Sequence, residues 1–199
     1  MAFEPELIAV HTAAHGRYDK DYDTTVQDLY QWHVKENGWS DVGYHFLVRK
    51  GGDVHPCRPL ERVGAHVRGW NSRALGVCFS GHGDIKPWTP EQWEGGLELL
   101  RELMFKFEIP DVEHVKGHRE FPRVAKSCPG KLVDMEEVRA RLHKLLIKTV
   151  ALPEDNFSQN KESIHGSLRI NSLDVRACGR VERTTQSSGS VRAKDRNDE

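Results

Sequence analysis

The chain has 199 residues, and its 29 lysine and arginine residues nearly balance 30 aspartate and glutamate residues. That length suits one compact domain with a tail, and the charge balance argues against a protein that binds nucleic acid through a basic surface. The sequence has no apolar run of about 18 residues and lacks the basic start and apolar core of a secretory signal, so it predicts neither a transmembrane helix nor export. We therefore expect a cytosolic protein with no membrane segment and no direct nucleic-acid binding.

The first predicted elements are a strand and a helix. Residues 7–10 form a short apolar run, which predicts a buried strand that ends at His11. After a polar loop, Thr24 with Gln27 three positions later has the pattern of a capping box and predicts a helix start. Gly38 is a typical residue for the end of that helix.

Further strands are predicted in the middle of the chain. Residues 44–49 predict a second strand, and the glycines at 51 and 52 turn it into a hairpin that returns along residues 53–55. Residues 74–79 are a continuous apolar run, as is typical of a central strand with both faces covered.

Two longer helices complete the pattern. Thr89, Pro90 and Gln92 combine a cap, a proline at the first helical position and a capping box. Asp134 is expected to cap the last helix. Apolar residues recur on one face of each helix, so that face is expected to pack on the core. They are Trp93, Leu97, Leu100, Met104 and Phe107 in one helix and Val138, Leu142, Leu145 and Leu146 in the other.

The order of the elements predicts an α/β fold with a mixed central β-sheet flanked by helices. This single domain is expected to cover residues 1–149, and residues 150–199 form a polar C-terminal extension. Residues 168–175 have the composition of one short strand, whereas residues 184–199 are almost free of apolar side chains and predict disorder.

The four cysteines are widely and irregularly spaced, so a disulfide framework is not expected in a cytosolic chain. Cys57 and Cys78 lie among strand-like residues and are predicted to be small buried hydrophobes. Cys128 is different, because Pro129 and Gly130 follow it and place it in a loop.

Three residues suggest a metal site. His11 ends a predicted strand, His118 follows a strand-like end, and Cys128 lies ten residues later in a loop. Two imidazoles and one thiolate form a zinc ligand set with an open fourth position, which is the pattern of catalytic rather than structural zinc. Spacing alone leaves the alternative of three unrelated surface or capping residues, because the chain has 11 histidines.

Several motifs occur together in one order. They are Val10-His11-Thr12, Gln31-Trp32-His33, Gly43-Tyr44-His45-Phe46, Gly76-Val77-Cys78, His118-Arg119-Glu120 and Ala125-Lys126-Ser127-Cys128-Pro129-Gly130. In this order they resemble the zinc N-acetylmuramoyl-L-alanine amidases of the phage lysozyme type, whose fold is shared with the animal peptidoglycan recognition proteins. The resemblance runs from about residue 7 to residue 147 and implies an amidase domain of that type.

The resemblance implies an activity and a set of site residues. The reaction is hydrolysis of the amide between N-acetylmuramic acid and L-alanine in bacterial peptidoglycan by a zinc-activated water. His11, His118 and Cys128 are then the Zn²⁺ ligands, and Tyr44 and Lys126 are the catalytic pair. Lys126 stabilises the oxyanion, and Tyr44 hydrogen-bonds the water or carries a proton. The alternatives are a core aromatic for Tyr44 and a solvated loop charge for Lys126, and the general base stays open.

The loop before the third apolar run is a predicted substrate groove. By resemblance, His66, Arg68, Trp70 and Asn71 line it, since aromatic and basic groups suit a sugar face and a peptide carboxylate. The alternative is an ordinary polar loop.

Two other classes of function stay open beside the enzyme. One is a module that binds peptidoglycan or a protein partner without turnover, and the other is a structural metal protein, which would need four ligands. The wall-recycling amidases usually carry aspartate as third ligand, so Cys128 favours the lytic branch, a phage or prophage endolysin. Such a protein is expected to be monomeric in the host cytoplasm and to reach the wall after membrane permeabilisation. The resemblance also raises the phage RNA polymerase as a partner, although these motifs carry no sign of it.

Overall fold

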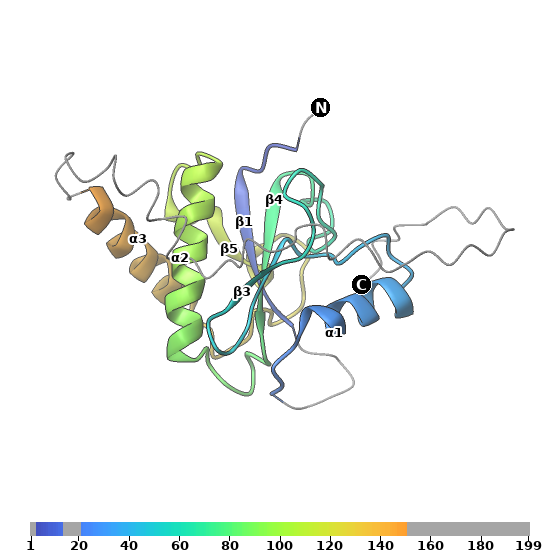
Figure 1. The fold of residues 1–199 in the computed structure, drawn as a ribbon. Helices are drawn as coiled ribbons and strands as arrows, with labels where there is room; N and C mark the ends of the chain where they lie inside the picture. Colours follow the sequence, from blue (N-terminus) through green and yellow to red (C-terminus); the bar gives the residue numbers. More distant parts are fainter. Residues whose placement is uncertain (1–2, 14–20, 151–199) are drawn as a thin grey trace, which may run out of the picture.

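The computed structural model describes residues 3–13 and 21–150, and over these ranges it has a five-stranded sheet with helices on both faces (Figure 1). The predicted C-terminal extension, with its expected strand over residues 168–175, lies outside the described residues. Among the described helices, none combines the length and the apolar character that crossing a membrane requires.

The sheet is mixed, as predicted. Its strands are β1 (Leu7–Ala13), β2 (Phe46–Val48), β3 (Val54–Pro56), β4 (Ala74–Ser80) and β5 (Val115–Gly117). Their order across the sheet is β3-β2-β4-β1-β5. The pairs β2–β4, β4–β1 and β1–β5 are parallel, and β3 returns antiparallel to β2 through the predicted hairpin. The short β5 was not predicted as a separate strand.

The two central strands explain the continuous apolar runs of the sequence. All of β4 is buried, and β1 is buried except at Thr12. Helices cover both faces of a parallel sheet, so a polar side chain on either face of these strands would be buried at a cost in free energy. Their register pairs Val10 with Val77 and His11 with Cys78. Because β1, β4 and β5 are parallel, their carboxyl ends meet at one edge, which places His11 beside the residue that follows Gly117.

Helices cover the sheet unequally (Figure 1). Helices α2 (Pro90–Lys106) and α3 (Met135–Val150) pack on one face, where they enclose the larger apolar core with Leu100, Met104 and Leu142. On the other face, α1 (Val26–Tyr30) continues into the π-helical segment η1 (Gln31–Glu36) around a smaller core with Leu29. The 3₁₀ turns η2 (Val112–His114) and η3 (His118–Glu120) flank β5.

The N-caps of α1 and α2 can be compared with the capping residues that the sequence predicted. Thr89 caps α2 and forms the predicted capping box with Gln92. The prediction for α1 was wrong by one residue, because the cap is Thr25, which forms the box with Asp28. The hydroxyl of Thr24 is buried and donates to the carbonyl of Ala13 at 2.7 Å, so this side chain closes the end of β1 instead.

Candidate active site

A cleft opens at the carboxyl edge of the parallel strands. Its volume is about 330 Å³. The residues that line it are Thr12, Tyr44, His82, Asp84, His118, Lys126, Ser127, Cys128 and Gly130. All but Tyr44, which precedes β2, come from the ends of β1, β4 and β5 or from the loops that follow, which is where open α/β sheets place their ligands.

The three predicted metal ligands lie together in this region. His11 is buried near the end of β1, which continues past the predicted end to Ala13, and His118 and Cys128 are half-buried beside it. One ligand atom from each residue lies within 4.8 Å of the other two, and His11 Nδ1 is 3.9 Å from Cys128 Sγ. In a tetrahedral zinc site, ligand atoms about 2.0–2.3 Å from the metal lie roughly 3.3–3.8 Å apart, so small side-chain movements bring this set to zinc distances.

The loop that carries Cys128 is fixed by hydrogen bonds from two directions. Arg119 reaches under it, where the guanidinium donates to the carbonyls of Gly130 and Val133 at 2.7 Å each and to that of Ser127 at 3.3 Å. Asp84 holds its outer side by accepting from Ser127 Oγ at 2.5 Å. The Cys128 thiol is therefore held in the cleft by the loop backbone.

Two further contacts aim the ligands. The backbone N–H of Thr12 donates to Cys128 Sγ at 3.3 Å, which stabilises negative charge on the sulfur. Glu120 accepts from the N–H of Gly117 at 2.6 Å and from the Arg139 guanidinium, so the turn that begins at His118 is braced against α3. Within the motif His118-Arg119-Glu120, the second and third residues thus hold the loop and the turn.

Burial sets the protonation of the candidate ligands. It lowers the pKa of His11 well below its usual value, and it lowers that of His118 to about 4, with Lys126 adding to the effect. Both imidazoles are therefore neutral near pH 7 and able to bind a metal. Burial raises the pKa of the Cys128 thiol to about 11, so metal binding there releases a proton and becomes stronger as pH rises.

Tyr44 and Lys126 both line the cleft. The Tyr44 ring lies 5.0 Å from that of His11 and 5.4 Å from that of His33, measured between centroids. Burial raises the pKa of the Tyr44 phenol well above its usual value, so the hydroxyl keeps its proton and acts as a hydrogen-bond donor. Lys126 is exposed at the rim, two residues before Cys128.

The four predicted groove residues lie outside this cleft. The ring of His66 lies behind His11, and the Asn71 carboxamide accepts from the N–H groups of His66 and Val67 within their own loop. Trp70 packs against Phe121. Arg68 is exposed. A groove role for these residues stays a prediction, and the structure adds contacts for three of them that the loop pattern did not predict.

His82 and Asp84 line the cleft and were missed from the sequence. They follow the carboxyl end of β4 at Ser80 closely, and His11 lies near the carboxyl end of β1. The rule that ligands bind at the carboxyl ends of parallel strands therefore indicates this segment too. Asp84 accepts hydrogen bonds on both oxygens, from Ser127 Oγ and from the N–H of Lys131, and the Ser127 bond lowers its pKa.

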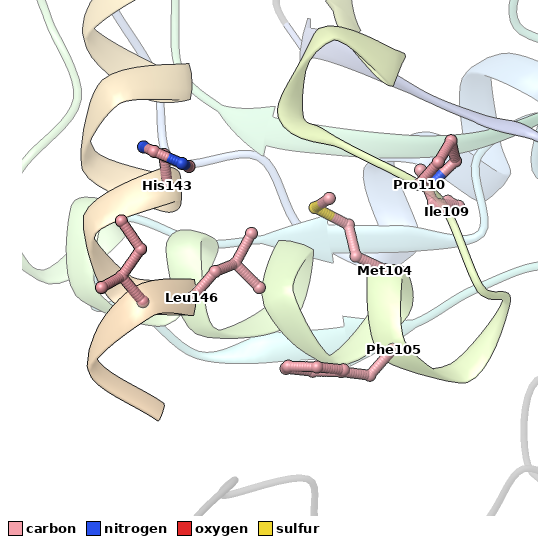
Figure 2. Close-up of a pocket in the computed structure, with 7 residues that line it drawn as sticks. Met104, Phe105, Ile109, Pro110, His143 and Leu146 are labelled. Atoms are coloured by element: carbon pink, nitrogen blue, oxygen red, sulfur yellow. The ribbon is translucent and has the colours of Figure 1, made fainter. Parts of the chain in front are cut away.

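A larger cavity, of about 500 Å³, lies between the C-terminal parts of α2 and α3 (Figure 2). Met104, Phe105 and Leu146 line it, and His143 is its one titratable lining residue. An apolar hollow without convergent polar groups offers no means to activate water. The smaller cleft is therefore the candidate active site.

Comparisons with known proteins show the family to which the chain is similar. The model of the family described as N-acetylmuramoyl-L-alanine amidase matches residues 2–131. The endolysin of Klebsiella phage KP32 is 43% identical over 132 residues, which are 64% of this chain and 82% of that protein. Peptidoglycan-recognition protein SC2 of Drosophila melanogaster is 31% identical over 107 residues, or 54% of this chain and 57% of that protein. Among solved structures, the N-acetylmuramoyl-L-alanine amidase LysC from Clostridium intestinale URNW superposes with a TM-score of 0.62 at 34% identity and covers 71% of this chain and 87% of its own.

Proposed function

The chain belongs to the N-acetylmuramoyl-L-alanine amidase family, and from this premise we propose that its catalytic centre is a zinc ion held by His11, His118 and Cys128. The protein is a peptidoglycan amidase of the phage endolysin type, which cuts the amide bond between N-acetylmuramic acid and L-alanine and so serves host lysis. The metal and the roles of individual residues are the proposed part.

One observation carries the proposal: the three ligand atoms converge within 4.8 Å in a cleft that Tyr44 and Lys126 also line. Two nitrogens and one sulfur suit zinc, and three protein ligands leave the fourth position for chemistry. When bound, zinc supplies a Lewis acid and an activated water near neutral pH.

Lys126 and Tyr44 act on the substrate carbonyl. Lys126 places a cation at the rim, where it attracts the negative charge that develops on the carbonyl oxygen. Tyr44 lines the same cleft with a protonated hydroxyl, which is hydrogen-bonded to Cys78 in the structure and would donate to the substrate when it binds. Asp84 is the carboxylate among the lining residues, but both its oxygens accept hydrogen bonds that fix the Cys128 loop, so bracing is its role.

A module that binds peptidoglycan without turnover is the competing function. It would need the shape of the cleft but neither the convergent ligands nor a protonated tyrosine beside them. The proposed partner is accordingly peptidoglycan as a substrate, and binding of the phage RNA polymerase and a monomeric state stay predictions from the resemblance.

The decisive experiment incubates the purified protein with isolated peptidoglycan and analyses the released ends by mass spectrometry. We expect free L-alanine amino ends that vanish after chelation and return with added Zn²⁺. Cleavage that continues unchanged after complete metal removal would refute the zinc proposal. Products with cut glycosidic or peptide cross-links would refute the bond assignment.

The Lys126→Ala variant tests the oxyanion role in the same assay. We expect normal folding and zinc content with a loss of turnover of about 100- to 1000-fold, the usual effect of removing one oxyanion partner. Lys131→Ala is a matched control, because this lysine is exposed in the same loop and does not line the cleft. Equal activity in the two variants would show that Lys126 is only a solvated charge on the loop.

A further inference from the structure

We propose that His66 is a positioning residue that holds His11 in the one tautomer able to bind zinc. The inference rests on the proposed function, because it takes His11 to be a ligand. It is carried by a chain of hydrogen bonds that runs from the strand backbone through His66 to the side of the His11 ring that faces away from the cleft.

When both rings are neutral, the chain of hydrogen bonds allows only one assignment of protons. His66 Nε2 is 3.1 Å from the carbonyl oxygen of Ala74, and a carbonyl only accepts, so the proton of neutral His66 lies on Nε2. His66 Nδ1 then carries a lone pair. It lies 3.1 Å from His11 Nε2, which must therefore donate. The lone pair of neutral His11 is left on Nδ1, the nitrogen that faces Cys128 Sγ at 3.9 Å.

The surroundings of His66 are shaped to hold this ring. A Cβ atom added at Gly64 would lie 2.5 Å from His66 Cδ2, and one added at Gly76 would lie 2.6 Å from the same atom. The two glycines thus let the backbone close on the ring from two sides. The His45 ring packs edge-on against it at 5.8 Å between centroids.

His45 is itself fixed to the backbone. Its Nδ1 accepts from the N–H of Gly76 at 2.9 Å, and its Nε2 donates to the carbonyl of Arg62 at 2.9 Å. The ring of His66 therefore has no freedom to flip without breaking contacts on every side. A ligand imidazole whose second nitrogen is held in this way keeps its orientation before the metal arrives.

The experiment compares His66→Asn with His66→Leu, two side chains of nearly the same size and branching. Asparagine keeps an acceptor oxygen where His66 Nδ1 lies, leucine removes it, and both lose the donor to Ala74. We expect zinc affinity, measured by competition with a chromophoric chelator, to fall about 10- to 100-fold in the leucine variant and only a few-fold in the asparagine variant. Equal affinities in the two variants would overturn the proposal.

A second measurement needs no variant and covers the case in which His66→Leu fails to fold. Long-range ¹H–¹⁵N spectra of the wild-type protein report which ring nitrogen carries the proton, with and without zinc. We expect Nε2–H on both His66 and His11 in both states. A proton on Nδ1 of either ring in the metal-free protein would overturn the proposal.

These readouts separate two failures. If His118→Ala and Cys128→Ser leave zinc binding unchanged, the ligand set and the proposed function fail. If those variants lose zinc while the two His66 variants match wild type, only the positioning role of His66 fails.

Discussion

Replacing Arg119 by methionine tests how strongly the Cys128 loop is built into the fold. Methionine keeps most of the aliphatic stem but removes the donors to the carbonyls of Gly130 and Val133, at 2.7 Å each, and the longer contact to Ser127. Hydrogen bonds from a charged donor contribute roughly 1.5–3 kcal/mol each. The two short bonds would sum to about 3–6 kcal/mol, and partial exposure of Arg119 reduces this to about 2–4 kcal/mol.

The assay is urea unfolding and thermal melting of the zinc-loaded and metal-free proteins. For a domain of this size the loss corresponds to a decrease in Tm of about 5–15 °C. Because the loop carries Cys128, we also expect weaker zinc binding. Arg123→Met is the matched control, since Arg123 is exposed in the same loop. If Arg119→Met has the same Tm and the same zinc affinity as Arg123→Met, Arg119 does not brace the Cys128 loop.

Three further outcomes follow from the structure. Burial lowers the pKa of His45 to about 4 from an ordinary 6.5, so its contribution to stability is complete above pH 6.5 and decreases as pH falls toward 4. At pH 5 the loss is about 2 kcal/mol, so the decrease in the urea midpoint of the metal-free protein between pH 7 and pH 5 should be smaller in His45→Gln, although the other buried histidines still contribute to it. Cys128→Ser should lose most bound zinc, measured by metal analysis of the purified protein, because serine is a much poorer ligand than a thiolate; full zinc content would contradict the ligand set. A chain ended after Val150 should keep its melting temperature, zinc and wall cleavage, since the cleft and both cores lie before that residue; a melt many degrees lower would show that residues 151–199 belong to the fold.

The apolar pattern of the sequence predicted most of the architecture. Continuous apolar runs predicted β1 and β4, because central parallel strands are buried on both faces. Thr89, Pro90 and Gln92 predicted the start of α2, since capping is decided by residues close in sequence. Strand β5 was missed because three residues at a sheet edge carry too little pattern, and its place depends on pairing with β1 far away in sequence.

Only part of the candidate site could be predicted from the sequence. Strand ends and the family resemblance predicted that His11, His118 and Cys128 lie together, and the structure brings them together. The bracing contact between Asp84 and Ser127 joins loops 43 residues apart, which no local pattern encodes. For His66, the resemblance predicted a place in the substrate groove but not the contact with His11, because that depends on the space left by Gly64 and Gly76.

The placement of the candidate ligands has a consequence for when activity can arise. His11 belongs to the first strand, and Cys128 lies 117 residues later, beyond the last strand. During synthesis, a nascent chain that ends before Cys128 lacks part of the ligand set, and so does either isolated half of the domain. Zinc held as proposed would close a loop that spans most of the domain, so it would stabilise folded chains that extend past Cys128 over unfolded and shorter forms. For an amidase of the endolysin type, this placement would make lytic competence a late event, reached only after synthesis has passed Cys128 and the domain has folded.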